Sequence, residues 1–144
     1  MNSRYPFHII LLIITAAGLF LLSCTKDSQH PVPDVNVNFV LNLHTTQHIE
    51  LNNIGGWAYY TGGYKGIIIY RQSVDEFRAF DRACPYHPFD DCALVKVFDP
   101  PLATDTCCGS TFLLLDGSVV TGPSQWPLKQ YRTYLDGNFL YVSN

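Results

Sequence analysis

One segment, residues 107–131, constrains the fold of this 144-residue chain more than any other. Within it, two short runs rich in apolar and β-branched residues, 111–115 and 119–121, flank the dipeptide Asp116-Gly117. Asp-Gly suits the positive φ angles of a type I′ turn, so the pattern predicts a β-hairpin. The segment is therefore expected to consist of short antiparallel strands joined by tight turns.

Further strand signals extend this prediction to the rest of the chain. Asp136-Gly137 separates another pair of apolar runs near the C-terminus. Residues 35–43 alternate apolar and polar side chains with period two, which is typical of a half-buried strand. Other short apolar runs bounded by turn residues are 57–60, 66–71, 76–81 and 94–98. With plentiful Gly, Pro, Tyr and Phe and no convincing helical period, the sequence predicts an all-β domain.

The N-terminal residues have the pattern of a bacterial lipoprotein signal peptide. Arg4 precedes an apolar stretch over 9–22, which ends in Leu-Leu-Ser-Cys at Cys24. We expect residues 1–23 to be this signal peptide and Cys24 to carry a lipid, which would anchor the protein to the periplasmic face of a bacterial membrane. An ordinary signal peptide and an N-terminal membrane anchor are the alternatives, and both also place the domain outside the cytoplasm.

After such cleavage the chain is a short tether followed by one domain. Residues 24–34 carry polar side chains and two prolines with little to bury, so we expect a tether there and a single domain over 35–144. Loss of Arg4 leaves eight basic against twelve acidic residues, a net charge of −4 without a basic run. This balance disfavours nucleic acid as a partner and leaves membrane attachment to the lipid.

Segment 107–131 resembles the second cluster-binding loop and closing strands of a Rieske iron-sulfur domain. The residues that carry the resemblance are Gly109, Ser110, Phe112, Asp116, Gly117, Gly122, Pro123, Pro127, Leu128 and Tyr131. The resemblance implies antiparallel sheets packed as a sandwich, with a cluster-loop subdomain inserted at about 81–127. It implies one-electron transfer through a 2Fe-2S cluster, with a redox protein as partner.

The ligand positions depart from the family pattern. Rieske domains hold one iron by two Cys and the other by two His, supplied as Cys-x-His and Cys-x-x-His. The resemblance places Cys84 at the first Cys position, Tyr86 at the first His position, Asp105 at the second Cys position and Cys108 at the second His position. His87 lies one residue beyond the first His position. Because Cys84 alone is in register, we expect the chain to lack an ordinary cluster.

Three interpretations of the site stay open. The first has no metal, the second an iron-sulfur cluster with altered ligands, and the third zinc or another ion, for which Cys84, His87 and Cys108 are the candidate donors. The resemblance places Ser110 and Pro123 around the cluster loops, where the family serine donates a hydrogen bond to a cluster sulfur. Without a cluster, Ser110 would be a turn residue that satisfies local backbone groups.

The cysteines offer a disulfide framework as well. With Cys24 lipidated, four remain, and joining the adjacent Cys107 and Cys108 would close a strained ring. The resemblance implies a disulfide between Cys92 and Cys107, because many Rieske proteins carry one between the cluster loops. Cys84 and Cys108 would then face each other as thiols, as a second disulfide or as part of a metal site.

These patterns predict an electron carrier or a binding module rather than an enzyme. Neither a Ser-His-Asp arrangement nor a phosphate-binding loop is visible in the sequence. His44 and His48 would form a metal pair on a helix, but their surroundings predict a polar turn. With a cluster, the function implied is electron transfer, and without one a disulfide-stabilised structural or partner-binding module.

Overall fold

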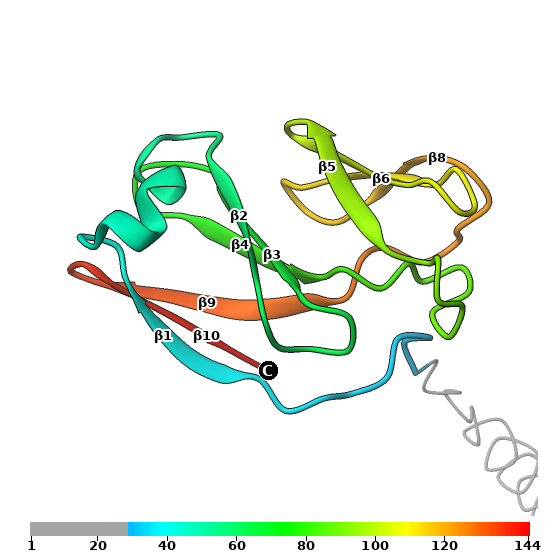
Figure 1. The fold of residues 1–144 in the computed structure, drawn as a ribbon, viewed down its shortest axis with the longest axis horizontal. Coiled ribbons are helices and arrows are strands. Elements are labelled where there is room, and N and C mark those ends of the chain that lie inside the picture. The colour runs from blue at the N-terminus through cyan, green and yellow to red at the C-terminus, as the bar shows by residue number, and fades with distance from the viewer. Residues whose placement is uncertain (1–28) are drawn as a thin grey trace, which may run out of the picture.

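In a computed structural model of the protein, which describes residues 29–144, the chain forms two antiparallel sheets (Figure 1). The six-stranded base sheet has the order β1-β10-β9-β4-β3-β2. Its strands are β1 Asn38–Asn42, β2 Trp57–Tyr60, β3 Ile67–Arg71, β4 Phe77–Asp81, β9 Gln130–Asp136 and β10 Phe139–Ser143. The four-stranded sheet has β5 Val95–Asp99, β6 Leu102–Asp105, β7 Thr111–Leu113 and β8 Val119–Thr121, in that order.

The smaller sheet is an insertion into the base sheet. Strands β5 to β8 lie in sequence between β4 and β9, and these two strands pair directly through Ala79 with Tyr131 and Phe80 with Gln130. The predicted all-β fold, with antiparallel sheets and an inserted cluster-loop subdomain, is therefore confirmed.

Strand β3 explains why two cores can share one sheet. Ile67 and Ile69 belong to the hydrophobic core of the base, whereas Ile68 and Tyr70 belong to the core that contacts the inserted sheet. Successive side chains of a strand point to opposite faces, so an unbroken apolar run is what a strand buried on both faces requires. Each fully buried isoleucine contributes about 1.5 to 3 kcal/mol to stability.

Three local predictions differ from the structure. Both Asp-Gly hairpins form, but positive φ angles occur only at glycines in the described chain, so neither turn is type I′. Strand β6 was not predicted, and it follows a Pro-Pro pair and gains its ladder from β5 and β7. The expected polar turn around His48 is a 3-10 helix, Thr46–Asn52, with a kink at His48, whose buried ring lies 3.0 Å from the Tyr60 hydroxyl.

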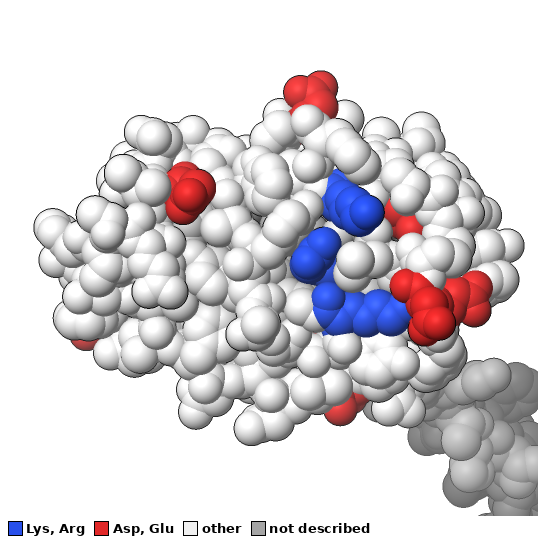
Figure 2. Space-filling view, in the orientation of Figure 1, with Lys and Arg blue, Asp and Glu red and all other residues white. Residues whose placement is uncertain are grey.

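Basic side chains join the inserted subdomain to the base. Figure 2 shows Lys and Arg gathered near the middle of one face, between the two sheets of Figure 1. Arg82 lies 3.8 Å over the ring of Tyr59, and its Nε donates to Val95 O at 3.3 Å. Lys65 Nζ donates to Ala93 O at 3.3 Å and to Asp90 O. These contacts fix the orientation of the loop that follows β4.

The described end of the segment predicted as a tether lies against the domain. Val32 is 1% exposed, and the buried amine of Lys129 donates to Val32 O at 3.1 Å, to Pro33 O at 2.8 Å and to the Asp34 carboxylate. The hydrogen bond and charge of Lys129 lower the pKa of Asp34. The predicted signal peptide and Cys24 lie outside the described residues. Within residues 29–144, no helix is long and apolar enough to cross a membrane.

Candidate functional site

Two loops of the inserted subdomain bring three possible donor side chains together. Cys84 follows β4, where Ala83 forms an isolated bridge with Leu94. Asp105 ends β6, and the tight turn to β7 that contains Cys108 begins there. One ligand atom from each of Cys84, Asp105 and Cys108 lies within 4.8 Å of the other two. We call these three residues the Cys-Asp-Cys group.

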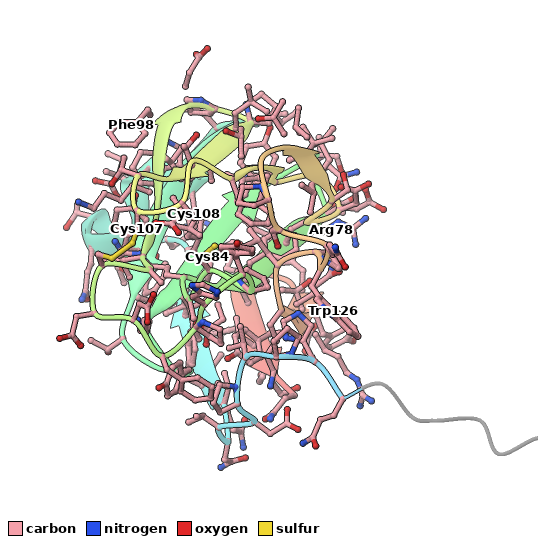
Figure 3. All side chains as sticks on the ribbon, turned by 90° about the vertical axis from the view of Figure 1, so that its right-hand side faces the viewer. Arg78, Cys84, Phe98, Cys107, Cys108 and Trp126 are labelled. Atoms are coloured by element: carbon pink, nitrogen blue, oxygen red, sulfur yellow. A yellow bond between two sulfur atoms is a disulfide. The ribbon has the colours of Figure 1, made fainter. Side chains whose placement is uncertain are left out.

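The two thiols of the group face each other from separate loops (Figure 3). The Sγ atoms of Cys84 and Cys108 are 3.5 Å apart, and both residues are free cysteines. Cys84 is completely buried, whereas Cys108 is half-buried. This contact brings together the first and last of the four ligand positions that the resemblance implied.

Asp105 is buried but only partly satisfied. Its Oδ1 accepts a hydrogen bond from the Cys107 N–H at 2.9 Å, whereas Oδ2 has no hydrogen-bond partner among residues 29–144. Burial works to raise the pKa of Asp105, but the Cys107 N–H and the nearby thiols outweigh it and lower that pKa. The group therefore contains a buried carboxylate oxygen that is free to accept.

Ser110 supports the sulfur of Cys108 from the next turn of the chain. The Cys108 thiol donates to Ser110 Oγ at 3.1 Å, and the Ser110 N–H approaches the same sulfur at 3.4 Å. Ser110 Oγ also accepts from the Ser124 N–H at 3.1 Å, which ties the Gly-Pro loop to the site. Gly122 has a φ of +104°, and a Cβ there would lie 2.4 Å from Ser110 Cα. Only glycine permits this close approach.

The adjacent cysteines 107 and 108 have different partners, as expected from the strain of a disulfide between neighbours. Cys107 forms a disulfide with Cys92, and the two Cα atoms are 5.5 Å apart (Figure 3). The predicted Cys92–Cys107 pairing is thus confirmed. It links the loop after β4 to the turn between β6 and β7, the two loops that hold the Cys-Asp-Cys group.

His87 does not join the group, which corrects its place among the candidate donors. The chain turns where the Asp90 N–H donates to His87 O at 3.1 Å, and this turn directs the imidazole outward. There His87 Nδ1 lies 3.4 Å from the Asp90 carboxylate, and the ring stacks on Tyr86 at a centroid distance of 4.2 Å. The resemblance placed Asp105 at a degenerate cluster position, but Asp105 was not predicted as a donor to a single ion, although carboxylates are ordinary zinc ligands.

The residues present do not fit a cluster bound as in the Rieske family. The Cys-Asp-Cys group contains no imidazole, and Tyr86 is 42% exposed. In the family pattern the positions of Cys84 and Cys108 serve different irons, which are bridged by sulfide. Here the two sulfur atoms are in contact at 3.5 Å, which is too close for ligands of two different irons.

The thiol pair is also a poor site for rapid thiol chemistry. Burial raises the pKa of the Cys84 thiol well above its usual value; the Tyr86 N–H opposes this in part, and the Asp105 carboxylate and the Cys108 thiol add smaller increases. A thiol that stays protonated is a weak nucleophile. The group is better suited to binding than to disulfide exchange.

A concave region elsewhere on the domain has none of the Cys-Asp-Cys group in its lining. A cavity of about 850 Å³ runs along β2 beside the 3-10 helix. Its polar pair, His48 and Tyr60, is already hydrogen-bonded. Burial, with a contribution from Glu50, raises the pKa of Tyr60 to about 12.

Comparison with known proteins gives distant structural similarity alone. No protein-family profile and no curated protein matches the sequence. A protein assigned as the small subunit of an NADH-dependent nitrite reductase from Mycobacterium tuberculosis is 13% identical, with a TM-score of 0.46, over 77% of this chain and 97% of that chain. The terminal oxygenase of carbazole 1,9a-dioxygenase from Nocardioides aromaticivorans IC177 is 19% identical, with a TM-score of 0.41 over 62% of this chain. This chain spans 26% of the oxygenase chain.

Proposed function

We propose that this chain is a Rieske-like domain without a two-iron cluster, and that it acts outside the cytoplasm as a partner-binding module anchored by a lipid on Cys24. The observation that carries the proposal is the 3.5 Å contact between the sulfur atoms of Cys84 and Cys108. These residues occupy positions that would serve different irons in the family. Their direct contact supports a site in which the two thiols meet without a cluster between them.

The surface beside the group supports binding of another molecule. Tyr86 is 42% exposed and Phe89 is 70% exposed, although both are large apolar side chains close in sequence to Cys84. Tyr86 also lines a cavity of about 260 Å³, together with Pro31, Pro85, Pro123, Gln125 and Trp126. Exposed aromatic residues around a shallow cavity are typical of protein interfaces. In this proposal, the loops that hold a cluster in Rieske domains instead contact a partner.

An electron carrier with altered ligands is the second candidate. It is favoured by the convergence of Cys84, Asp105 and Cys108 from two loops, because thiolates and carboxylates are able to ligate iron. Under this alternative the domain would transfer single electrons to a redox protein near the membrane.

Cofactor analysis distinguishes the two candidates. The full-length protein would be extracted anaerobically from membranes of its native host, and its absorption spectrum, iron and acid-labile sulfide would be measured. We expect neither labile sulfide nor a cluster spectrum. Stoichiometric iron and sulfide would overturn the proposal and establish the electron carrier.

The anchor has a separate test. Cys24→Ala should release the protein into the soluble fraction, because the lipid is attached to that sulfur. A Cys24→Ala protein that is processed normally and stays in the membrane would show that the anchor is something else.

A further inference from the structure

The Cys-Asp-Cys group has the dimensions of a site for one metal ion. Zinc binds thiolate sulfur at about 2.3 Å with tetrahedral geometry, so two thiolates on the same ion are about 3.8 Å apart. The Sγ atoms of Cys84 and Cys108 are 3.5 Å apart, within a few tenths of an ångström of that value. A disulfide between them would need a separation of about 2.0 Å. The sulfurs therefore lie closer to a shared ion's geometry than to a covalent bond.

Asp105 supplies the independent evidence for a ligand. Asp105 is 0% exposed, and its Oδ2 has no hydrogen-bond partner within the described chain. An unpartnered buried carboxylate oxygen is costly and rare in folded proteins. Because this carboxylate lies within 4.8 Å of both thiols, a cation between the three side chains would satisfy it.

The surrounding hydrogen bonds are those that metal ligands usually require. The Cys107 N–H holds the other carboxylate oxygen of Asp105 at 2.9 Å and so fixes the side chain. The Ser110 N–H lies 3.4 Å from the sulfur of Cys108 and would stabilise it as a thiolate. Such second-shell partners orient ligands and raise metal affinity.

We propose that Cys84, Asp105 and Cys108 bind a single divalent ion of the zinc class, with two sulfur donors, one oxygen donor and a fourth position for water or an exogenous ligand. Binding displaces one proton from each thiol, and no oxidant or reductant is involved. The inference rests on the proposed function, because an iron-sulfur cluster would use the same side chains.

The test is metal binding by the reduced, metal-free, full-length protein in detergent. Titration with Zn²⁺ should give one ion per chain, and Co²⁺ should give an absorption spectrum with thiolate-to-metal charge-transfer bands. Bound Zn²⁺ should protect the thiols of Cys84 and Cys108 from alkylation. Failure to bind either ion would overturn the inference, as would a cobalt spectrum without thiolate bands.

Variants identify the ligands. Asp105→Asn keeps the oxygen that accepts from the Cys107 N–H, so we expect it to fold and to lose about 100-fold or more in Zn²⁺ affinity. His87→Gln is the matched control, since its imidazole is exposed and paired with Asp90, and it should bind Zn²⁺ like the parent. Unchanged affinity of Asp105→Asn, or an equal loss in His87→Gln, would contradict the ligand set.

Two further outcomes separate this inference from the proposed function. Iron with labile sulfide in the natively isolated protein would overturn both. A Cys84–Cys108 disulfide that resists reduction in the folded protein would overturn the metal site alone, and the clusterless binding module would stand.

Discussion

Two buried carboxylates, Asp81 at the end of β4 and Asp105 at the end of β6, are partnered very differently. Asp81, at the end of β4, accepts four hydrogen bonds: from the N–H groups of Tyr64 at 2.5 Å, Lys65 at 3.2 Å and Ala83 at 2.8 Å, and from the Tyr131 hydroxyl at 2.7 Å. Asp105 accepts one. Both residues are 0% exposed, so burial alone does not distinguish them.

The difference separates a structural carboxylate from a candidate ligand. At Asp81 the neighbouring backbone approaches the carboxylate closely. A Cβ on Gly63 would lie 2.4 Å from Asp81 Oδ2, and the positive φ of Gly63 is easily adopted only by glycine. Burial and the hydrogen bond to Asp81 raise the pKa of Tyr131, which keeps that hydroxyl a donor. At Asp105 one oxygen is left over. Matched substitutions at the two positions test this contrast.

The largest effect is expected for Asp81→Asn. The amide replaces one acceptor oxygen with an NH₂ group and leaves at least one buried N–H without a partner, so the free energy of unfolding should fall by about 3 to 5 kcal/mol. Urea unfolding of the full-length protein measures it. A loss below about 1 kcal/mol would remove the contrast with Asp105.

Loss of the Cys92–Cys107 disulfide should be the next largest effect. It closes a loop with a sequence separation of 15, for which the chain-entropy estimate is about 3 kcal/mol. The double variant Cys92→Ser with Cys107→Ser avoids a new free thiol beside Cys84 and Cys108. The parent measured under reducing conditions is the control, and it should unfold at nearly the same urea concentration as the double variant.

Tyr131→Phe tests one of the four bonds at Asp81. Removing a hydrogen bond to a charged acceptor, while the ring stays buried, should lower the free energy of unfolding by about 2 kcal/mol. Tyr134→Phe, on the same strand and 66% exposed, is the matched control and should have the parent's stability. Equal losses in the two variants would show that the Asp81 bond contributes nothing specific.

The smallest effect is expected for Asp105→Asn in the metal-free protein. Its Oδ2 has no partner in the described chain, so an amide at this position loses no hydrogen bond, and stability should stay within about 1 kcal/mol of the parent. The same unfolding assay applies, with excess chelator present. A loss as large as that of Asp81→Asn would mean that Oδ2 has a structural partner.

Most strands could be predicted because their signals are local. Alternation over 35–43 and the apolar run 66–71 depend on nearest neighbours in sequence, and β1 and β3 lie within them. Strand β6 could not be predicted in this way. It has only four residues after two prolines, which is too short for a recognisable pattern, and its hydrogen bonds come from β5 and β7. His48 was also missed, because its burial depends on Tyr60, twelve residues away.

The site was predicted in part for a similar reason. The resemblance to Rieske domains placed Cys84, Asp105 and Cys108 at cluster-ligand positions, and the structure brings them together. Spacing alone suggested His87, but the direction of its ring depends on the turn to Asp90. The unsatisfied oxygen of Asp105 is a property of packing, and no sequence pattern reports it.

The contact of the N-terminal residues with the loop end fixes where the domain would lie relative to a bilayer. His30 Nε2 is 3.0 Å from Pro127 O, and Pro31 lines the same cavity as Tyr86 and Pro123. Five residues lie between His30 and Cys24, so the two Cα atoms are at most about 20 Å apart even in a fully extended chain. A lipid on Cys24 would therefore confine these loops to a thin layer of solvent above the headgroups. A protein partner that binds these loops would have to present its complementary surface within that layer, close to the membrane.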